Sequence, residues 1–403
     1  MIDPTRSDCS RQAMINLIAT CFGLASTFVV QTMLLITIPL SALELGASPF
    51  FLGFILSVPY LLPLILAIPF AGTISRLGGK AIVIAGSLGM MMGPLAILVL
   101  PGFIGLILVQ LIVGISHMAL ILAGQSIISG LGKGRALEKY FGWYTTCLSA
   151  GQLVGPLLAG WIIDTSGTTL SFMVTILVAA LAMISGFFLT GSAKVGNRVE
   201  RSLLGYRAQA NLLKTNAGVK ISIVLTVSVV FALGAYGTFL PVYLNSLSVS
   251  ATAIGALVSL RALFSMLVRP FVSSVIKWAG GRSVAIAWSP VLVALGFMFT
   301  GMTDSFIFLA LLAALIGLGS GISQPLSMVV LAESVSEGQR SGALGMRLMG
   351  NRAVQFLAPL SLGALAEFLP FSLVFLLGGA FIFVFVGLIF YLMPAFKSQE
   401  SGS

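Results

Sequence analysis

Long apolar stretches dominate this sequence of 403 residues. About twelve of them, each roughly 20 residues long, alternate with short connections, and a helix of that length crosses the ~30 Å hydrocarbon core of a bilayer. Inside lipid the backbone must satisfy its own hydrogen bonds, which only helices and closed barrels achieve. The sequence therefore predicts an all-α membrane protein with spans at 13–40, 49–71, 80–100, 103–129, 141–163, 170–190, 219–243, 251–275, 282–301, 306–332, 342–366 and 370–393.

The charged residues divide the connections into two classes. Counted from a cytoplasmic start, the odd-numbered connections hold only the acids Glu44, Asp164, Asp304 and Glu367. Cytoplasmic loops attract Lys and Arg. We therefore expect both termini in the cytoplasm and the spans in the plasma membrane or the bacterial inner membrane. The cations of the tails and even-numbered connections are Arg6 and Arg11; Arg76 and Lys80; Lys133, Arg135 and Lys139; Lys194 through Lys220; Lys277 and Arg282; Arg340; and Lys397.

Composition excludes several other classes of protein. Hydrophobic residues make up 58% of the chain and charged residues 8%, far from the averages of soluble domains. The net charge of +10 reflects the cytoplasmic bias, so the bilayer, and not nucleic acid, is the expected partner of a monomer. With three cysteines and one histidine, no disulfide framework, metal site, cofactor or catalytic triad is expected. The chain is predicted not to be an enzyme, and without a Walker-type loop it does not draw directly on ATP.

One long polar segment interrupts the apolar pattern and separates six spans from six. This predicts an N-terminal six-helix bundle at 1–190, a cytoplasmic linker at 191–218 and a C-terminal six-helix bundle at 219–403. Part of the linker is expected to lie as an amphipathic helix on the membrane surface.

The two halves repeat one another at offsets of 202 to 207 residues. The matched runs are Gly78-Gly79-Lys80 with Gly280-Gly281-Arg282, Gly114-Ile115-Ser116-His117 with Gly321-Ile322-Ser323-Gln324, and Gln152 with Gly155-Pro156 against Gln355 with Ala358-Pro359. Such an internal repeat predicts two pseudo-symmetric six-helix bundles around a central pathway, an architecture common among secondary carriers.

The fifth span carries a glycine–proline motif at Gly151, Gly155, Pro156 and Gly160. Small residues four apart let helix backbones approach closely, and Pro156 removes a backbone donor and permits a bend. Ordinary helix packing would use the same spacing. The run closely resembles the antiporter motif of the major facilitator superfamily, with Ala159 in place of one glycine. The resemblance covers nearly the whole chain and implies a twelve-span exporter of drugs or metabolites that works by antiport.

Two other motifs of that family are altered. The loop before the third span resembles the family pattern and keeps Arg76, Gly78 and Lys80, but Ser75 replaces the family's Asp. In the fourth span, Gln110 stands where antiporters of the family carry an Arg tied to proton handling. These departures weaken a simple assignment as a proton antiporter.

Cations inside the predicted spans indicate a polar cavity. A central Arg costs roughly 2.5–3.5 kcal/mol on insertion scales, and no carboxylate lies near the middle of a span. We expect Arg261 and Arg352 to clamp a substrate carboxylate or phosphate, with a structural role as the alternative. Arg269 and Arg347 are expected to reach the cytoplasmic surface or to bind helix-end carbonyls or Glu333. The other candidate substrate-binding residues are amides and phenols: Gln31, Tyr60, Gln110, Gln152, Tyr236, Gln324, Asn351 and Gln355.

His117 is the candidate for proton coupling. It is the sole histidine of the chain and lies in the fourth span. A free imidazole titrates near pH 6.5, which suits a proton switch. A neutral histidine bonded in a helix interface is the alternative.

Together these features predict a secondary transporter that moves a small amphiphilic or anionic organic compound by alternating access. The expected activity is export of a drug, metabolite or siderophore, with proton exchange as a candidate driving force. The alternatives are uptake or facilitated diffusion of an organic anion, and a non-transporting, lipid-handling role.

Overall fold

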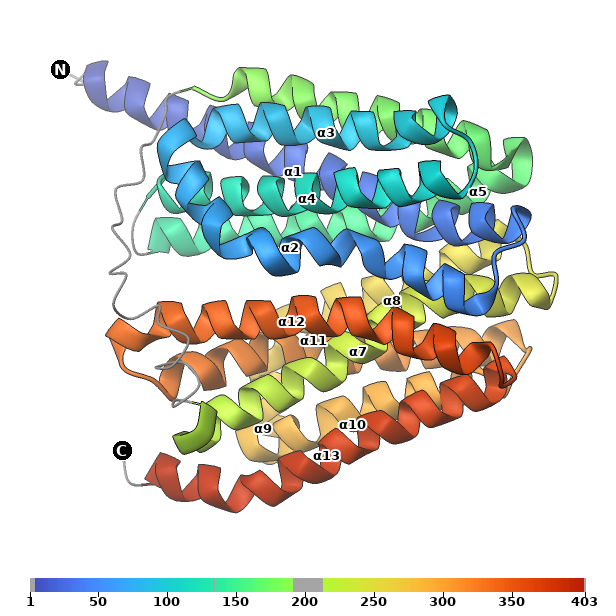
Figure 1. The fold of residues 1–403 in the computed structure, drawn as a ribbon. Helices are drawn as coiled ribbons and strands as arrows, with labels where there is room; N and C mark the ends of the chain where they lie inside the picture. Colours follow the sequence, from blue (N-terminus) through green and yellow to red (C-terminus); the bar gives the residue numbers. More distant parts are fainter. Residues whose placement is uncertain (1–3, 133–134, 191–212, 402–403) are drawn as a thin grey trace. The chain divides into compact units, whose positions relative to one another are not determined.

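The computed structural model describes residues 4–132, 135–190 and 213–401, and these residues form helices without any strand (Figure 1). Most of the predicted linker 191–218 lies outside the described residues, which resume at 213. Ten helices of the described chain are long and apolar enough to cross a membrane. The predicted all-α membrane fold is confirmed.

The first helices in the sequence are α1 (Pro4–Glu44), α2 (Pro49–Leu77), α3 (Gly79–Val99), α4 (Phe103–Ser129) and α5 (Arg135–Phe188). The helix α5 contains two predicted spans, 141–163 and 170–190. They meet at Gly167, whose φ of 84° and ψ of 173° are not helical. Glycine adopts this backbone conformation without a steric penalty, so the chain can turn there.

The later helices are α7 (Ala217–Ser246), α8 (Ala251–Val268), α9 (Val272–Trp278), α10 (Arg282–Thr300), α11 (Phe306–Glu333), α12 (Glu337–Ala366) and α13 (Phe371–Ser401). The predicted eighth span, 251–275, is interrupted by the 3-10 turn η2 (Arg269–Phe271). Pro270 explains the break, because proline cannot donate the helical hydrogen bond. The helix α12 is 30 residues long but is missing from the ten membrane-length helices because its polar residues lower its hydropathy.

The chain forms two compact units. Unit 1 consists of Met1–Ala47, Val58–Asn197 and Ser248–Ser259, and unit 2 of Ser48–Ser57, Arg198–Leu247 and Leu260–Ser403. The first residues of α2 therefore pack within unit 2, and the first residues of α8 pack within unit 1. In unit 1 the helix α1 contacts α3, α4 and α5, and in unit 2 the helix α7 contacts α10, α11, α12 and α13.

Small residues set the helix spacing inside unit 1. A Cβ atom at Gly151 would lie 2.6 Å from the carbonyl oxygen of Ala25, and one at Gly155 would lie 2.7 Å from that of Val29. Real Cβ atoms do not approach backbone oxygens so closely, so α1 and α5 can touch only because both positions are glycine. The hydroxyl of Thr32 donates to the Gly151 carbonyl over 3.1 Å at the same contact.

Many buried hydroxyl groups donate to backbone carbonyls of their own helix. Thr27 donates to Gly23 over 2.8 Å, and Ser323 donates to Gly319 over 2.7 Å. Lipid offers no alternative partner for a hydroxyl group, so this bond removes most of the cost of burying it.

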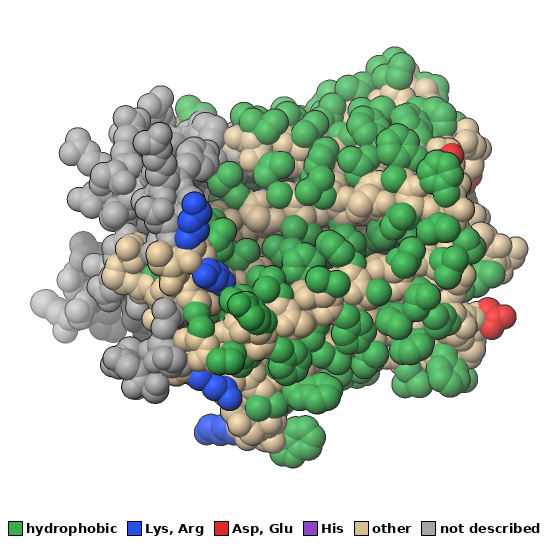
Figure 2. Space-filling model, turned by 60° about the horizontal axis from the view of Figure 1, so that its bottom comes forward, with side chains coloured by type: hydrophobic (Ala, Val, Ile, Leu, Met, Phe, Trp, Pro, Cys, Tyr) green, Lys and Arg blue, Asp and Glu red, His purple; other side chains and the backbone are tan. Residues whose placement is uncertain are grey.

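Cations and acids lie at opposite ends of the helices within each unit. In unit 1, Glu44 ends α1 whereas Lys80 begins α3, and in unit 2, Arg282 begins α10 whereas Glu367 follows α12. On the face drawn in Figure 2, Lys and Arg side chains gather at one end of the helices and Asp and Glu side chains at the other. The apolar side chains between these ends match the hydrocarbon layer.

Candidate functional site

A polar cluster of unit 2 gathers four side chains from α7, α8, η2 and α11. The Arg269 guanidinium donates to Oε1 of Gln324 over 3.4 Å. Arg261 lies close enough to the Tyr236 phenol and to Arg269 for electrostatic interactions with both. Three predicted substrate-binding residues, Tyr236, Arg261 and Gln324, therefore meet in one place. The contact of Arg269 with Gln324 is one that the sequence did not predict.

This cluster holds two cations and no described carboxylate. The acids of unit 2 whose side chains the structure describes are Asp304, Glu333 and Glu367, and each is exposed near a helix end. Glu333 forms an ion pair with Arg282. Two neighbouring guanidinium groups repel one another, and an anion between them relieves that repulsion. The cluster is therefore suited to a carboxylate or a phosphate, whose geometry matches the guanidinium fork.

The prediction that Arg347 reaches the cytoplasmic surface or binds Glu333 is wrong. Its side chain is 7% exposed, and it donates to Oγ1 of Thr226 over 3.0 Å and to Oγ of Ser327 over 2.9 Å. The hydroxyl groups of Thr226 and Ser327 in turn donate hydrogen bonds to the carbonyls of Ser222 and Gln324. Arg347 thus joins α12 to α7 and α11. Because hydroxyl groups on these two helices accept its hydrogen bonds, the guanidinium does not need to reach water.

The other polar residues of α12 have surroundings that differ from those of Arg347. Arg352 donates to Oε1 of Gln355 over 3.0 Å. Arg352 lies seven residues before Pro359, so both occupy one face of the helix. On that face the backbone of α12 contacts Gly53 of α2. Asn351 is turned about 100° away, and its buried Oδ1 has no hydrogen-bond partner among the described residues.

The candidates of unit 1 lie around α1, α4 and α5. The ring of His117 meets the ring of Phe28 edge to face, with centroids 4.9 Å apart. A Cβ atom at Gly151, next to Gln152, would lie 2.6 Å from Cβ of Phe28, so the aromatic side chain connects His117 to α5. Gln31 lies one turn further along α1, and its buried Oε1 has no hydrogen-bond partner among the described residues.

Gln110 and Tyr60 lie near the same face of α4. Gln110 is 5% exposed and lies seven residues before His117, which places both side chains on one face. Gly114 lies between them, and a Cβ atom there would lie 2.7 Å from Cα of Pro59, the neighbour of Tyr60. The structure therefore brings His117, Gln110 and Tyr60 to one region of unit 1.

The glycine–proline motif has two faces. Gly151 and Gly155 contact α1, whereas Pro156 and Gly160 contact the first turn of α8. A Cβ atom at Gly160 would lie 2.7 Å from the carbonyl carbon of Ala251. One short sequence therefore fixes α5 against two helices at once.

Two acids bind helix N-termini at matched positions of the repeat. These two contacts were not predicted from the sequence. Asp164 accepts the backbone N–H groups of Ala251 and Thr252 at 2.8 and 2.7 Å, at the start of α8. Glu367 accepts the N–H of Phe50 at 3.0 Å, at the start of α2. The first turn of a helix has free N–H groups and a partial positive charge, which a carboxylate stabilises.

The matched spacing was the available signal. Asp164 and Glu367 are 203 residues apart, like Gln152 and Gln355 or Pro156 and Pro359. In each repeat the acid follows the proline by eight residues. We call these two contacts the carboxylate latches, Asp164 with Ala251 and Thr252, and Glu367 with Phe50.

The loop motif before α3 is described only in part. Gly78 has φ of 83°, a conformation that favours glycine, and it ends the turn between α2 and α3. Lys80 donates to the carbonyl of Phe187 over 3.0 Å. Arg76 belongs to α2, but its side chain lies outside the described residues.

A family comparison decides the class of this protein. The model of the Major Facilitator Superfamily matches residues 20–246 and 222–403. The chain belongs to the Major Facilitator Superfamily. It is an integral membrane transporter, as the resemblance of its motifs implied.

Relatives and solved structures of the superfamily agree with this assignment. An uncharacterised MFS-type transporter of Methanocaldococcus jannaschii, MJ1560, is 22% identical over 361 residues, which cover 87% of this chain and 91% of the relative. A POT family transporter in complex with a thioalcohol-conjugated peptide superposes with a TM-score of 0.78 at 14% identity, covering 96% of both chains. An inward-facing bacterial homologue of the lysosomal transporter Spinster gives 0.74 at 13% identity, covering 96% and 98%. The nucleoside transporter NupG gives 0.70 at 16% identity, covering 95% and 99%.

Proposed function

We propose that this transporter exports a small amphiphilic organic anion by alternating access. The cluster of Tyr236, Arg261, Arg269 and Gln324 supports this proposal, because it places two cations beside neutral polar side chains and none of the carboxylates whose side chains are described. A cation at membrane depth is costly, so a substrate that brings a negative charge next to Arg261 gains binding energy. The apolar residues of the spans offer contacts to the rest of an amphiphile.

Export and antiport rest on the glycine–proline motif of α5. In the family this motif is associated with export, and here it holds α5 against both α1 and the start of α8. We place the transporter in the plasma membrane or the bacterial inner membrane, with both termini in the cytoplasm, on the basis of its Lys and Arg distribution.

His117 is our candidate for proton coupling. It lies on the face of α4 that also carries Gln110, and it touches Phe28 of α1. Gln110 replaces the Arg of proton antiporters, which favours a second candidate function, uptake or facilitated diffusion of the same anion without proton exchange.

The carboxylate latches supply a mechanism for the change of access. Each joins a helix of the predicted N-terminal bundle to a helix of the predicted C-terminal bundle, at the end that carries the acids. We infer that both latches open when the transporter exposes its site on that side and form again when it closes. Exposed carboxylates and helix N-termini exchange such bonds with water at low cost, which suits a reversible gate.

Transport by proteoliposomes tests the substrate class. We expect a panel of monocarboxylates, dicarboxylates and phosphate esters to include anions that the wild type carries, and Arg261→Gln to raise their KM at least tenfold. Arg282→Gln is the matched control, because Arg282 forms a surface ion pair with Glu333. Transport of cations or neutral compounds only, or an unchanged KM in Arg261→Gln, would refute the anion proposal.

A further inference from the structure

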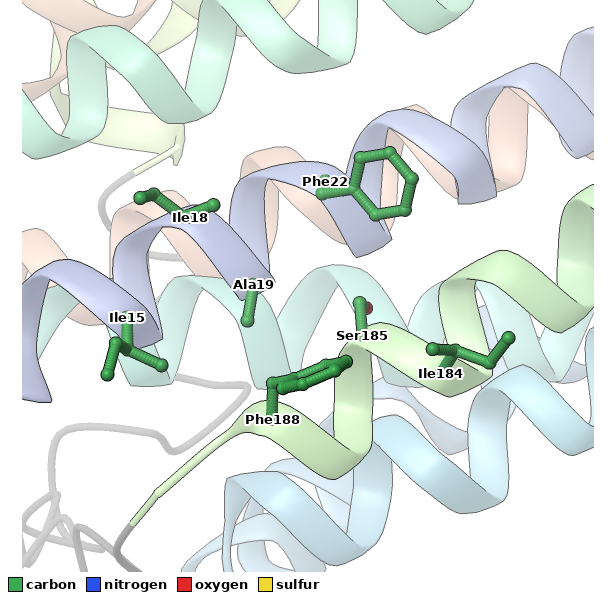
Figure 3. Close-up of a pocket in the computed structure, with 7 residues that line it drawn as sticks. All are labelled: Ile15, Ile18, Ala19, Phe22, Ile184, Ser185 and Phe188. Atoms are coloured by element: carbon green, nitrogen blue, oxygen red, sulfur yellow. The ribbon is translucent and has the colours of Figure 1, made fainter.

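An apolar groove runs along the start of α1 and the end of α5 in unit 1 (Figure 3). Its volume is about 270 Å³, and it is lined by Ile15, Ile18, Ala19, Phe22, Ile184, Ser185 and Phe188. Ile18 and Phe188 are exposed by 60% and 63%. The single hydroxyl group, on Ser185, already donates to the carbonyl of Ala182 over 2.7 Å. The groove is therefore open at the side of the helices and offers only carbon to an occupant.

Contacts between the two helices bound the groove at both ends. At one end Gly23 lies against the Ser185 side chain. At the other end Asn16 donates to the carbonyl of Thr190 over 2.8 Å and accepts the N–H of Thr190 at 2.8 Å. Because α1 and α5 are joined on each side, the groove persists and does not close by tilting the helices together.

Cations flank one end of the groove. Arg11, Ile15, Ile18 and Phe22 follow one another at spacings of four, three and four residues, so they form one stripe along α1. The Arg11 side chain is exposed. On the other side, Lys80 donates to the carbonyl of Phe187, the neighbour of Phe188. Both walls of the groove therefore end at a positive charge.

Two acids of unit 1 have side chains that the structure describes, Glu44 and Asp164, and both lie far from this end. Glu44 follows Phe22 by 22 residues in the same helix, a distance of roughly 33 Å at 1.5 Å per residue. Glu44 and Asp164 therefore do not compete for Arg11 and Lys80 at the mouth of the groove.

We propose that this groove binds one acyl chain of an anionic phospholipid, whose phosphate lies between Arg11 and Lys80. Basic sites between membrane helices on the cytoplasmic side attract anionic head groups, at about 1 kcal/mol for each cation near the surface. A groove bounded by Asn16 and Gly23 extends for only about 10 Å, which suits part of one chain and not the flank of a partner helix. The site is separate from the transport site.

Quenching by brominated lipids tests the proposal on the full-length transporter in vesicles. Phe22→Trp places a reporter on the rim of the groove, and its added fluorescence is measured against the parent protein, which carries four tryptophans. We expect phosphatidylglycerol brominated in its acyl chain to quench this reporter at least twofold more than equally brominated phosphatidylcholine. Phe308→Trp is the matched control, since Phe308 is exposed by 61%, against 51% for Phe22, and lies near the acid end of α11. There the two lipids should quench equally.

The cations are tested in the same assay. Adding Arg11→Gln and Lys80→Gln to Phe22→Trp should abolish the preference for phosphatidylglycerol while quenching by both lipids continues. Equal quenching by the two lipids in Phe22→Trp, or a preference that survives the double substitution, would overturn the proposal. Quenching of the Phe308→Trp control without any quenching at position 22 would show that protein covers the groove, and would also overturn it.

Discussion

Arg261 and Arg347 are chemically identical residues at membrane depth with different surroundings. Arg347 is buried and satisfied by two hydroxyl groups, whereas Arg261 has a phenol and a second cation beside it. The first arrangement stabilises the fold, because a guanidinium held by fixed acceptors needs no further partner. We propose that an anion completes the second. Their positions in the sequence alone do not distinguish the structural role from the substrate-binding role.

Substitutions should separate these two roles. Arg347→Ala should lower the free energy of unfolding by about 2–4 kcal/mol, because it removes two charge-assisted hydrogen bonds and leaves a cavity. Thermal melting of the purified protein in detergent measures this loss. Arg261→Gln should melt within a few degrees of the wild type but bind anions weakly. The opposite pattern, a stable Arg347→Ala and an unstable Arg261→Gln, would exchange the roles.

His117 is the sole histidine of the chain, and we propose it as the group that couples transport to protons. His117→Gln keeps a polar side chain of similar size but cannot titrate. We expect it to abolish the acceleration of transport by an imposed pH gradient while exchange of anion for anion continues. Flux in proteoliposomes with and without a pH gradient measures both. Full pH-driven flux in His117→Gln would exclude His117 as the coupling group.

At the scale of helices, the glycine–proline motif determines how closely α5 approaches its neighbours. Gly155→Leu should lower stability by about 1–3 kcal/mol or more, because its Cβ would press on the α1 backbone near Val29. Gly142→Leu is the control, since no atom lies within 4 Å of a Cβ built at this exposed position of α5. Melting temperatures of the two variants compare the effects. Equal melting temperatures would mean that the motif does not set the α1–α5 distance.

The carboxylate latches act on whole helices through their first turns. Asp164→Asn and Glu367→Gln remove the charge that faces the N-termini of α8 and α2, an interaction of about 1 kcal/mol each. Each variant should therefore favour the state that is open on the acid-bearing side, roughly fivefold. Alkylation by an impermeant maleimide of a cysteine at Gln355, in a background without native cysteines, should accelerate accordingly, and most in the double variant.

Glu44→Gln is the matched control for the latches. Glu44 is also an exposed acid at the same end of the helices, but it accepts the hydroxyl of Thr168, and both residues belong to unit 1 and to the predicted N-terminal bundle. Its alkylation rate should equal that of the wild type. Acceleration in Glu44→Gln to the same extent as in the latch variants would attribute the effect to surface charge in general.

How far the sequence predicts the structure depends on the range of the interaction. The spans follow from local hydropathy, and each of the twelve corresponds to helix in the described chain, with Gly167 and Pro270 marking the interruptions. The hydrogen-bond partners of a side chain, in contrast, depend on tertiary contacts. Hydropathy therefore could not show that Arg347 turns to Thr226 and Ser327, or that Asp164 reaches α8. The internal repeat was the one long-range signal, and it contains both latches.

At the scale of the whole molecule, we propose a carrier that binds an anion at one site and presents it alternately to the two sides of the membrane. Membership of the superfamily supports transport, and the cationic cluster supports an anion. The repeat supports the alternation, because two matched sets of contacts can break and form together. A channel would need neither latches nor a tight site.

Trans-stimulation tests this central claim most directly. Proteoliposomes are loaded with an unlabelled anion that the wild type carries, and the initial uptake of the same labelled anion is measured against empty proteoliposomes. If the carrier reorients faster with anion bound than without it, labelled anion should enter the loaded vesicles several-fold faster than the empty ones. Arg261→Gln should lose this acceleration at the same anion concentration. Uptake that is unchanged or slowed by internal anion in the wild type would contradict alternating access.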